Sequence, residues 1–500
     1  MGLVLFLSSG LFLGWSLGAN DAANVFGTAV GARMVRFRTA ALVCAVCVAL
    51  GATISGAGAA HTLGRLGEIN ALPGAFTVAL AAGLTTFWMT RLKLPVSTSQ
   101  SIVGAIIGWN VYTSSVTDTR ALSRIVGTWV VCPLLAGGIA VLLFLIIRWA
   151  VGRSRLHMLR LDALTRLGLL LVGAFGSYSL GANNIANVMG VFVPANPFHD
   201  LTFAGVTIGA TAQLFLLGAL AIGVGVITYS ERVMRTVGGG LLRLSPEAAL
   251  VVVLAQSLTL FLFASESLQH VLLAVGLPPI PLVPVSSSQA VVGAILGIGL
   301  LKGGRGIRFN VLGEIAAGWV ATPLAAGVLA LLLLFVMDNA FDLQVSRPVT
   351  YRLDTAVVAE LERRGLPAEG LGDLGALVGY SGTNAQLLKG RIEAATGWRG
   401  APVNDVVDAA RIEPILVDPA IIAETVDRHW LTVNQLMALR DLRDRRFDRA
   451  WEFHRALAEL TPDWRERPDL PANRAWNGEL QRKLAYADRL FAFVESPTRE

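Results

Sequence analysis

Long hydrophobic stretches separated by short polar or basic segments fill the first two thirds of the chain. A helix needs about 20 mostly apolar residues to cross a bilayer, and several of the stretches reach that length. We expect ten helical spans, five on each side of a basic linker, at residues 2–32, 39–60, 71–90, 95–109, 125–147, 167–193, 201–228, 247–275, 285–301 and 311–337. The pattern predicts an all-α polytopic membrane protein.

A polar motif interrupts the first and the sixth of these stretches. It reads Ser16-Leu-Gly-Ala-Asn20-Asp21-Ala-Ala-Asn24 in one and Ser179-Leu-Gly-Ala-Asn183-Asn184-Ile-Ala-Asn187 in the other. Asn and Asp are rare in hydrocarbon, because an unpaired polar group there costs several kcal/mol. A single Asn or Asp in a span could be explained by a polar contact between two helices. Their recurrence in one order predicts a duplicated polar site and a broken helix at each motif.

Two further motifs are duplicated in the same order. Pro95-Val-Ser97-Thr98-Ser99-Gln100 recurs as Pro284-Val-Ser286-Ser287-Ser288-Gln289, each before a similar apolar run. Trp129 and Pro133 recur as Trp319 and Pro323. Three matched blocks in one order indicate an internal repeat. We therefore expect membrane repeat 1 at 1–147, a basic cytoplasmic linker at 148–166 and membrane repeat 2 at 167–337.

The distribution of charge predicts the orientation. With about five spans in each repeat, the second copy is inverted in the membrane, and the basic residues agree with the positive-inside rule. They concentrate in the loops assigned to the cytoplasm, whereas the opposite loops carry only Arg65, Arg120 and Arg124. The N-terminus is then extracytoplasmic. Most of the 35 acidic residues follow residue 337. They predict a soluble, mostly helical domain of unknown role at 338–500, extracytoplasmic if ten spans are present.

The Pro-Val-Ser motifs predict helix starts at membrane depth. Proline is tolerated in the first turn of a helix, and Ser or Thr caps its free N–H groups. The spans that follow are short, as in half-helices or re-entrant hairpins. Because helix N-termini attract anions, two such termini rich in hydroxyl groups predict a site for a tetrahedral oxyanion. Hydroxyls that bond back to their own helix would explain the same residues without a ligand.

The interrupted spans supply hard oxygen ligands that suit sodium, or a proton on Asp21. A cation there would offset the charge of the anion, and inverted repeats with paired broken helices are typical of secondary transporters with a site near the midplane. Gln100 and Gln289 follow the capping residues and are expected to complete either ligand group. The expected cation-binding residues are Asn20, Asp21, Asn24, Asn183, Asn184 and Asn187.

On these duplicated motifs, residues 1–337 resemble the PiT family of inorganic phosphate transporters. The resemblance implies cation-coupled phosphate uptake by an inverted-repeat carrier in the cell membrane, often dimeric. It implies cation contacts from Asn20, Asp21 and Asn24 in the first copy of the polar motif. In the second copy it implies them from Asn183 and Asn187 but not from Asn184. It also implies phosphate contacts from Ser97, Thr98, Ser99, Ser286, Ser287 and Ser288.

Two departures from the family pattern leave the substrate and the coupling ion open. Many members carry a second Asp where this chain has Asn184, and many carry His at the positions of Gln100 and Gln289. Fewer carboxylates favour fewer coupled cations. They also suit sulfate, which brings no proton to accept and is carried by permeases within the family. Phosphate is the first expectation and sulfate or a related oxyanion the second, with either sodium or a proton as the coupling ion.

Other function classes fit less well. A channel on the same scaffold would line a continuous pore with charged rings or carbonyl groups, rather than two related half-sites. An enzyme would need a nucleophile–base or metal constellation, and the sequence contains no recognisable one, so we expect no enzymatic activity and no cofactor. A phosphate sensor that signals through residues 338–500 stays a third alternative. The basic residues belong to membrane loops, so no nucleic-acid partner is expected.

Overall fold

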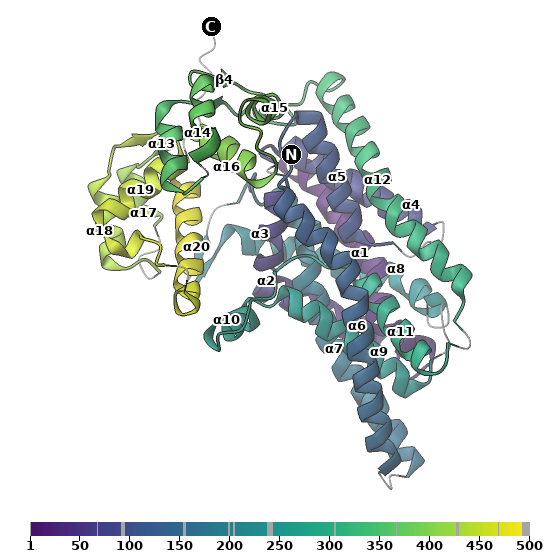
Figure 1. Cartoon of the computed structure of the whole chain (residues 1–500). Coiled ribbons are helices and arrows are strands. Elements are labelled where there is room, and N and C mark those ends of the chain that lie inside the picture. The colour runs from purple at the N-terminus through teal and green to yellow at the C-terminus, as the bar shows by residue number, and fades with distance from the viewer. Residues whose placement is uncertain are drawn as a thin grey trace. The chain divides into compact units, whose positions relative to one another are not determined.

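The computed structural model forms two compact units (Figure 1). The first unit comprises Met1–Glu266 and Ile280–Arg347, and the second comprises Ser267–Pro279 and Pro348–Glu500. The structure describes residues 2–492 except 68, 92–95, 154–156, 199–200, 204–205, 238–243, 305–306, 367, 427–429 and 469. Pro95 and parts of the basic loops, among them Lys93, Arg155, Arg243 and Arg305, therefore lie outside the described residues.

The first unit is a bundle of long helices. Their bounds are α1 (Gly2–Gly31), α2 (Phe37–Ser55), α3 (Ala57–Leu66), α4 (Leu72–Arg91), α5 (Thr98–Thr113), α6 (Thr119–Arg153), α7 (Met158–Met189), α8 (Ala210–Val237), α9 (Pro246–Ala264), α11 (Ser287–Leu301) and α12 (Phe309–Asn339). Within the described residues, seven helices are long and apolar enough to cross a membrane: α1, α2, α4, α6, α8, α9 and α12. The chain therefore has the helices of a multi-pass membrane protein.

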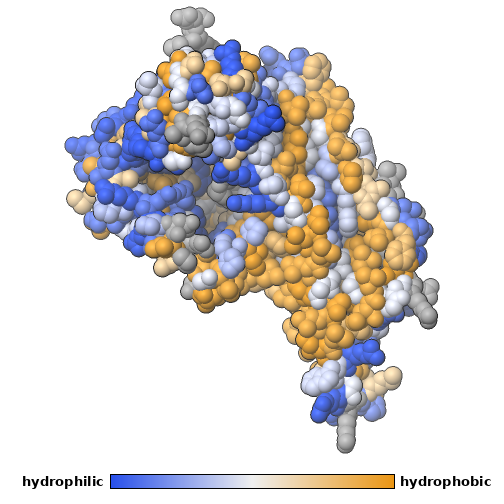
Figure 2. All heavy atoms as spheres, viewed as in Figure 1, coloured by the Kyte–Doolittle hydropathy of each residue, from blue (hydrophilic) through white to orange (hydrophobic). Residues whose placement is uncertain are grey.

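Apolar side chains cover the outside of this unit. On α12, Val320, Leu324, Val328 and Leu332 are all more than half exposed and follow one another at helical spacing. Figure 2 shows the hydrophobic surface that such residues form along the long helices. Soluble monomers rarely expose contiguous apolar patches above a few hundred Å². Lipid is the solvent that suits this surface.

The predicted breaks in the first and sixth spans are wrong, because α1 and α7 run through the polar motif without interruption. The polar side chains find partners on neighbouring helix ends, so the backbone has no need to unwind. Most of the other spans differ in their limits, and the span expected at 125–147 extends to Thr119–Arg153. The span expected at 201–228 begins as a hairpin of β1 (Leu201–Phe203) and β2 (Val206–Ile208), and the helix starts at Ala210. The span at 39–60 ends at Ser55, and that at 247–275 ends at Ala264, before the short helix α10 (Glu266–Ala274).

The two short helices each lie directly against a long one. A Cβ atom added at Gly104 of α5 would lie 2.0 Å from the carbonyl oxygen of Pro323 in α12. A Cβ atom added at Gly293 of α11 would lie 2.1 Å from the carbonyl oxygen of Pro133 in α6. Real Cβ atoms do not approach a backbone oxygen so closely, so only glycine permits this packing. The packing holds the start of each short helix at a fixed position.

We expect Gly104→Ala or Gly293→Ala to lower the free energy of unfolding by about 1–3 kcal/mol, because the helix must move to admit the methyl group. Gly313→Ala on α12 is the matched control, since a Cβ atom there meets nothing within 4 Å. Thermal unfolding of the purified chain in detergent measures the difference. Equal unfolding temperatures for all three variants would contradict the close packing.

The second unit repeats one order of elements. Its bounds are β3 (Tyr351–Arg352), α13 (Thr355–Arg363), α14 (Ala368–Leu374), β4 (Ser381–Gly382), α15 (Ala385–Thr396), α16 (Ala401–Ala410), β5 (Ile415–Leu416), α17 (Pro419–Glu424), α18 (Val433–Asp441), β6 (Arg446–Phe447), α19 (Ala450–Leu460) and α20 (Arg474–Phe491). Each half has a strand, two helices, an antiparallel partner strand and two more helices. The expectation of mostly helical structure after residue 338 is confirmed for the described residues.

Equivalent hydrogen bonds support this duplication. The residue after the first strand bonds twice to the loop before the second strand, through its N–H and through its C=O. In the first half Leu353 bonds Tyr380 and Gly379, at 3.0 and 2.8 Å. In the second half Val417 bonds Arg445 and Asp444, at 3.1 and 2.8 Å.

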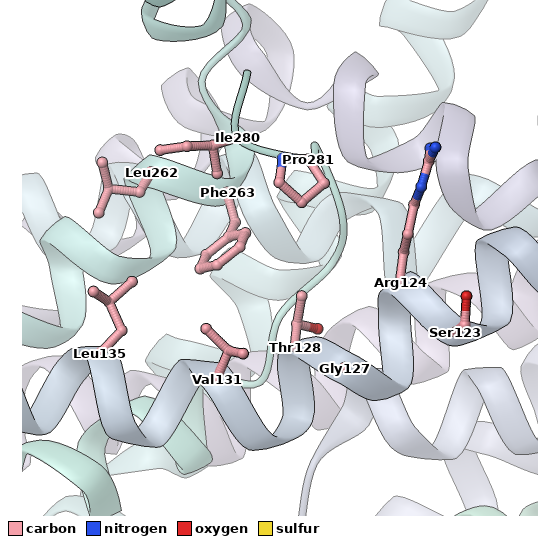
Figure 3. Close-up of a pocket in the computed structure, with 10 residues that line it drawn as sticks. All are labelled: Ser123, Arg124, Gly127, Thr128, Val131, Leu135, Leu262, Phe263, Ile280 and Pro281. Carbon is pink, nitrogen blue, oxygen red and sulfur yellow. The ribbon is translucent and has the colours of Figure 1, made fainter. Parts of the chain in front are cut away.

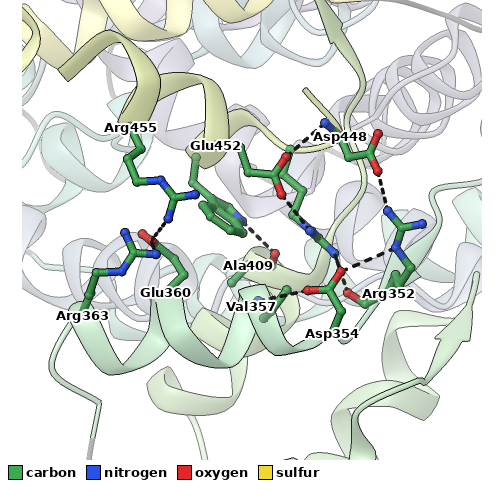
Figure 4. A network of polar contacts seen from close by, with 11 residues as sticks. Arg352, Asp354, Val357, Glu360, Arg363, Ala409, Asp448, Glu452 and Arg455 are labelled. Atoms are coloured by element: carbon green, nitrogen blue, oxygen red, sulfur yellow. Dashed lines mark hydrogen bonds and ion pairs between the residues drawn. The ribbon is translucent and has the colours of Figure 1, made fainter. Parts of the chain in front are cut away.

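A buried arginine joins the two halves of the second unit (Figure 4). The side chain of Arg449 is 2% exposed and donates to Asp354 Oδ2 at 2.6 Å and to Glu452 Oε1 at 2.9 Å. Partial burial raises the pKa of Asp354. The hydrogen bonds from Arg449 and the Val357 N–H, with the charges of Arg449 and Arg352, outweigh that effect and lower the pKa below its usual 3.8.

Acid should weaken the second unit. Because the folded pKa of Asp354 is lowered, its stabilising effect is present above pH 4 or so and is lost as the pH falls through the folded value. We expect Arg449→Met to destabilise the unit by about 1–2 kcal/mol at pH 7 and to flatten this acid dependence. Protease sensitivity of the tail in the full chain, followed between pH 7 and pH 3, measures both effects. The exposed Arg440→Met is the control, and a variant at Arg449 that keeps the wild-type acid profile would contradict the assignment.

Candidate functional site

The two Pro-Val-Ser motifs start helices, as the sequence predicts. Ser97 caps α5 by accepting from the Gln100 N–H at 3.3 Å, and Ser286 caps α11 by accepting from the Gln289 N–H at 3.2 Å. The hydroxyl residues of both motifs are buried, as are both glutamines. Each helix therefore presents a hydroxyl-rich N-terminus to the protein interior.

These N-termini contact each other reciprocally. Ser99 Oγ donates to the carbonyl oxygen of Val285, just before α11, and Ser288 Oγ donates to the carbonyl oxygen of Val96, just before α5, each at 3.2 Å. The structure thus brings the two motifs together, although 189 positions separate Ser97 from Ser286 (286 − 97 = 189). The alternative explanation, in which these hydroxyls bond back to their own helices, does not hold for Ser99 and Ser288.

The first copy of the polar motif reaches the N-terminus of α11. Ser287 Oγ donates to Asp21 Oδ2 at 2.8 Å and accepts from Asn24 Nδ2 at 3.2 Å. Asn20 Nδ2 donates to the other carboxylate oxygen of Asp21 at 3.0 Å. Asp21 is 2% exposed, so its charge faces neutral hydroxyl and amide groups inside the unit.

The second copy reaches both N-termini. Asn187 Nδ2 contacts Ser99 Oγ at 2.8 Å and Asn184 Oδ1 at 2.9 Å. Asn183 clamps the chain before α11, because its Nδ2 donates to the carbonyl of Val285 at 2.7 Å and its Oδ1 accepts from the Val285 N–H at 3.1 Å. Together the contacts gather all the predicted residues around two adjoining helix N-termini.

Several buried polar atoms of this cluster have no hydrogen-bond partner among the residues that the structure describes. They include both donors and acceptors: Thr98 Oγ1, Asn184 Nδ2, Asn187 Oδ1, Gln100 Oε1 and Gln289 Oε1. A buried polar group without a partner costs about 1–3 kcal/mol, and proteins retain few of them. Donors suit an oxyanion, whereas amide oxygens beside a carboxylate suit a hard cation. The residues present therefore fit both kinds of ligand.

Gln256 of α9 is a polar residue that the sequence analysis missed. Its side chain is fully buried, and within the described part of the chain neither its amide nitrogen nor its amide oxygen has a hydrogen-bond partner. Helix α9 packs against α7 and α11, which carry residues of the cluster. Gln256 stands singly in an apolar span with no duplicated counterpart, so the repeat gave no reason to select it. A lone amide in the middle of a membrane span was the available signal.

The charge of the site comes from Asp21. In the part of the chain that the structure describes, no Lys, Arg or His hydrogen-bonds to any predicted site residue. The described residues also contain no group of three or more His, Cys, Asp or Glu side chains that could hold a metal ion. Neutral donors hold an anion less tightly than arginines do, which suits a protein that must release what it binds.

Comparison with known proteins decides the family. The sequence model of the phosphate transporter family matches residues 17–164, 159–330 and 279–363. The chain belongs to the phosphate transporter family. It is therefore a membrane transporter and not an enzyme. The matches end at residue 363, so most of the second unit lies beyond them.

Relatives of this phosphate transporter family member match about two thirds of the chain. A protein of Haemophilus influenzae, assigned by name as a phosphate permease, is 25% identical over an alignment of 421 residues, which covers 67% of this chain and 96% of that protein. One from Methanocaldococcus jannaschii with the same assignment is 27% identical over 330 residues, covering 66% and 94%. A solved structure entitled "The sodium-dependent phosphate transporter" matches with a TM-score of 0.55 at 23% identity, covering 67% of this chain and 98% of that one. This last likeness shows a shared fold.

Proposed function

We propose that the chain carries inorganic phosphate across the cell membrane together with sodium, by alternating access. The observation that carries the proposal is the reciprocal contact of the two helix N-termini. Ser99 bonds the chain before α11, and Ser288 bonds the chain before α5. An oxyanion between them meets N–H and hydroxyl donors from both sides and the positive ends of two helix dipoles.

Phosphate fits the unpartnered atoms better than sulfate does. Near neutral pH phosphate keeps at least one P–O–H donor, whereas sulfate has none. Gln100 Oε1 and Gln289 Oε1 are buried acceptors that can receive such a proton, while Thr98 Oγ1, which has no partner among the described residues, donates to another oxygen of the anion. Sulfate would leave these acceptors unpaired, at about 1–3 kcal/mol for each. The substrate-binding residues are proposed to be Ser97, Thr98, Ser99, Gln100, Ser286, Ser287, Ser288 and Gln289.

The cation is proposed to bind beside Asp21. The carboxylate and the amide oxygens of the polar motifs are hard ligands, and sodium prefers oxygen. Ser287 links the two sites, because its hydroxyl touches Asp21 and its backbone opens α11. Charge on the cation then stabilises the anion across a short distance in a region of low dielectric constant. The cation group is proposed to be Asn20, Asp21, Asn24, Asn183, Asn184 and Asn187.

We propose that alternating access rests on two inverted repeats, at 1–147 and 167–337, joined by the cytoplasmic linker 148–166. The paired contacts of Gly104 with Pro323 and of Gly293 with Pro133 support the repeat, because each joins a short helix of one copy to the last helix of the other. The proposed topology has an extracytoplasmic N-terminus, an extracytoplasmic soluble domain at 338–500 and a homodimer in the membrane.

Uptake of radiolabelled phosphate into proteoliposomes tests the function. We expect accumulation driven by an inward sodium gradient, unchanged by a tenfold or so excess of sulfate. Accumulation under a proton gradient alone would show that the coupling ion is a proton and not sodium. Sulfate uptake in place of phosphate would make the chain a sulfate permease, and flux that only dissipates a gradient would indicate a channel.

A further inference from the structure

A cavity outside the polar cluster opens on the first unit between α6, the end of α9 and the segment that leads to α11 (Figure 3). Its volume is about 360 Å³. The lining side chains are mostly apolar, with Arg124 at one end and Leu135 toward the other. The lining residues are Ser123, Arg124, Gly127, Thr128, Val131, Leu135, Leu262, Phe263, Ile280 and Pro281.

The polar end of this cavity carries one positive charge. Ser123 and Thr128 use their hydroxyls to bond carbonyls of their own helix, at 3.0 and 2.6 Å. Arg124 is exposed and forms no hydrogen bond or ion pair with any residue that the structure describes. A guanidinium group at the mouth of an apolar cavity is complementary to an anionic head on an apolar chain.

The depth of the cavity indicates what the apolar chain is. Arg124 directly precedes the apolar run of α6 that begins at Ile125, so it lies where the hydrocarbon gives way to the head groups. From there the lining follows one face of α6 into the hydrocarbon, through Gly127 and Val131, both exposed on the outside of the unit. An apolar groove that is open to the bilayer along its length is accessible to acyl chains and not to water.

We propose that this groove binds an anionic phospholipid, with the lipid phosphate paired to Arg124 and one acyl chain along Val131, Leu135 and Phe263. The site differs from the transport site, and its occupant is a membrane component rather than a transported ion. Its far wall, Ile280–Pro281, runs on to Ser286, which caps α11. The Val283 N–H donates to the carbonyl of Phe263 at 3.2 Å, so the lipid chain packs against the segment that opens the second half-site.

Native mass spectrometry of the full chain in mild detergent tests the proposal. Phosphatidylglycerol and phosphatidylcholine with identical acyl chains are added in parallel, and the fraction of protein that retains each lipid is measured. We expect phosphatidylglycerol to be retained preferentially. Arg124→Gln should reduce its retention about fivefold, the effect of one partly exposed ion pair. Arg148→Gln, at the other end of the same helix, is the matched control and should leave it unchanged.

A second variant fills the groove without disturbing the fold. A Cβ atom at Gly127 or at Gly138 of α6 meets nothing within 4 Å, so both sites accept a larger side chain. Gly127→Leu should displace the lipid, whereas Gly138→Leu, outside the groove, should not. Both variants should unfold at or above the wild-type temperature, since Leu favours helix over Gly.

Three results would overturn the proposal. Equal retention of the two lipids would show that Arg124 does not recognise the head-group charge. Unchanged retention in both Arg124→Gln and Gly127→Leu would show that the lipid binds elsewhere. A dimer that dissociates on Gly127→Leu would mean that a second copy of the chain covers the groove. Because none of these readouts involves uptake, they leave the proposed transport function untouched.

Discussion

Replacing Asp21 by Asn is expected to abolish sodium-driven phosphate accumulation while the protein stays folded. Asn keeps the size of the side chain and an oxygen that accepts from Ser287, so the contact at 2.8 Å can persist. The variant removes the negative charge beside the proposed cation. A unit charge about 4 Å away contributes about 4 kcal/mol at an effective dielectric constant near 20, which corresponds to about a thousandfold in cation affinity. Phosphate uptake into proteoliposomes under a sodium gradient measures the loss.

Asp162→Asn is the matched control for Asp21→Asn. Asp162 lies on α7 and pairs with Arg166 at 2.8 Å on the surface, so its neutralisation makes the same chemical change outside the polar cluster. This variant should accumulate phosphate at close to the wild-type rate. Normal sodium-driven accumulation by Asp21→Asn would refute the cation assignment. Loss of uptake in both variants would indicate a general effect of charge on the membrane unit.

The starts of α5 and α11 were predictable from sequence, because their signal is local. Pro followed by Ser and an apolar run specifies a capped helix, and the caps at Ser97 and Ser286 form with the expected backbone groups. Duplication also selected polar residues that the structure brings together around the starts of α5 and α11, because the same residue types recur at the same places in both motifs.

The course of the helices through the polar motif was not predictable in the same way. An Asn in an apolar span either breaks the helix or finds a partner from another element, and the sequence does not say which. Here Ser287 and Val285 supply the partners, and both lie more than 100 positions from the Asn residues that they contact. Gln256 was not selected from the sequence for a related reason. Only its burial distinguishes it from an exposed amide, and the sequence does not show burial directly.

The duplication in the second unit was also hidden from sequence. Its two halves share the pairing of two-residue strands and the capping of the next helix by Asp354 and Asp418. Backbone hydrogen bonds at Leu353 and Val417 define the relation, and many side chains satisfy such bonds equally well. The repeats of the membrane unit could be recognised in the sequence because polar side chains recur in them in the same order. In the second unit the backbone hydrogen bonds recur, and the sequence does not show them.

Asn183→Ala is expected to destabilise the membrane unit and to weaken phosphate binding. Its amide satisfies both the N–H and the C=O of Val285, which is fully buried. Truncation leaves the buried Val285 N–H unpaired, at a cost of about 1–3 kcal/mol, and leaves Ser99 Oγ as the one side-chain donor to the Val285 carbonyl in the described structure. The freed segment leads directly into the cap of α11, so the second half-site becomes mobile. We expect a lower unfolding temperature together with a rise of about tenfold in the phosphate KM.

The first repeat supplies the control for this variant. Asn20 occupies the same place in its motif, yet its amide donates to Asp21 at 3.0 Å and makes no bond to Val96 in the described structure. Asn20→Ala therefore removes the same atoms without releasing a backbone segment, and in sodium-free buffer it should lower the unfolding temperature much less than Asn183→Ala. Equal destabilisation by the two variants would mean that the two hydrogen bonds from Asn183 to the Val285 backbone do not fix the start of α11. A large difference would show that the two half-sites, although built from the same motif, are held by different means.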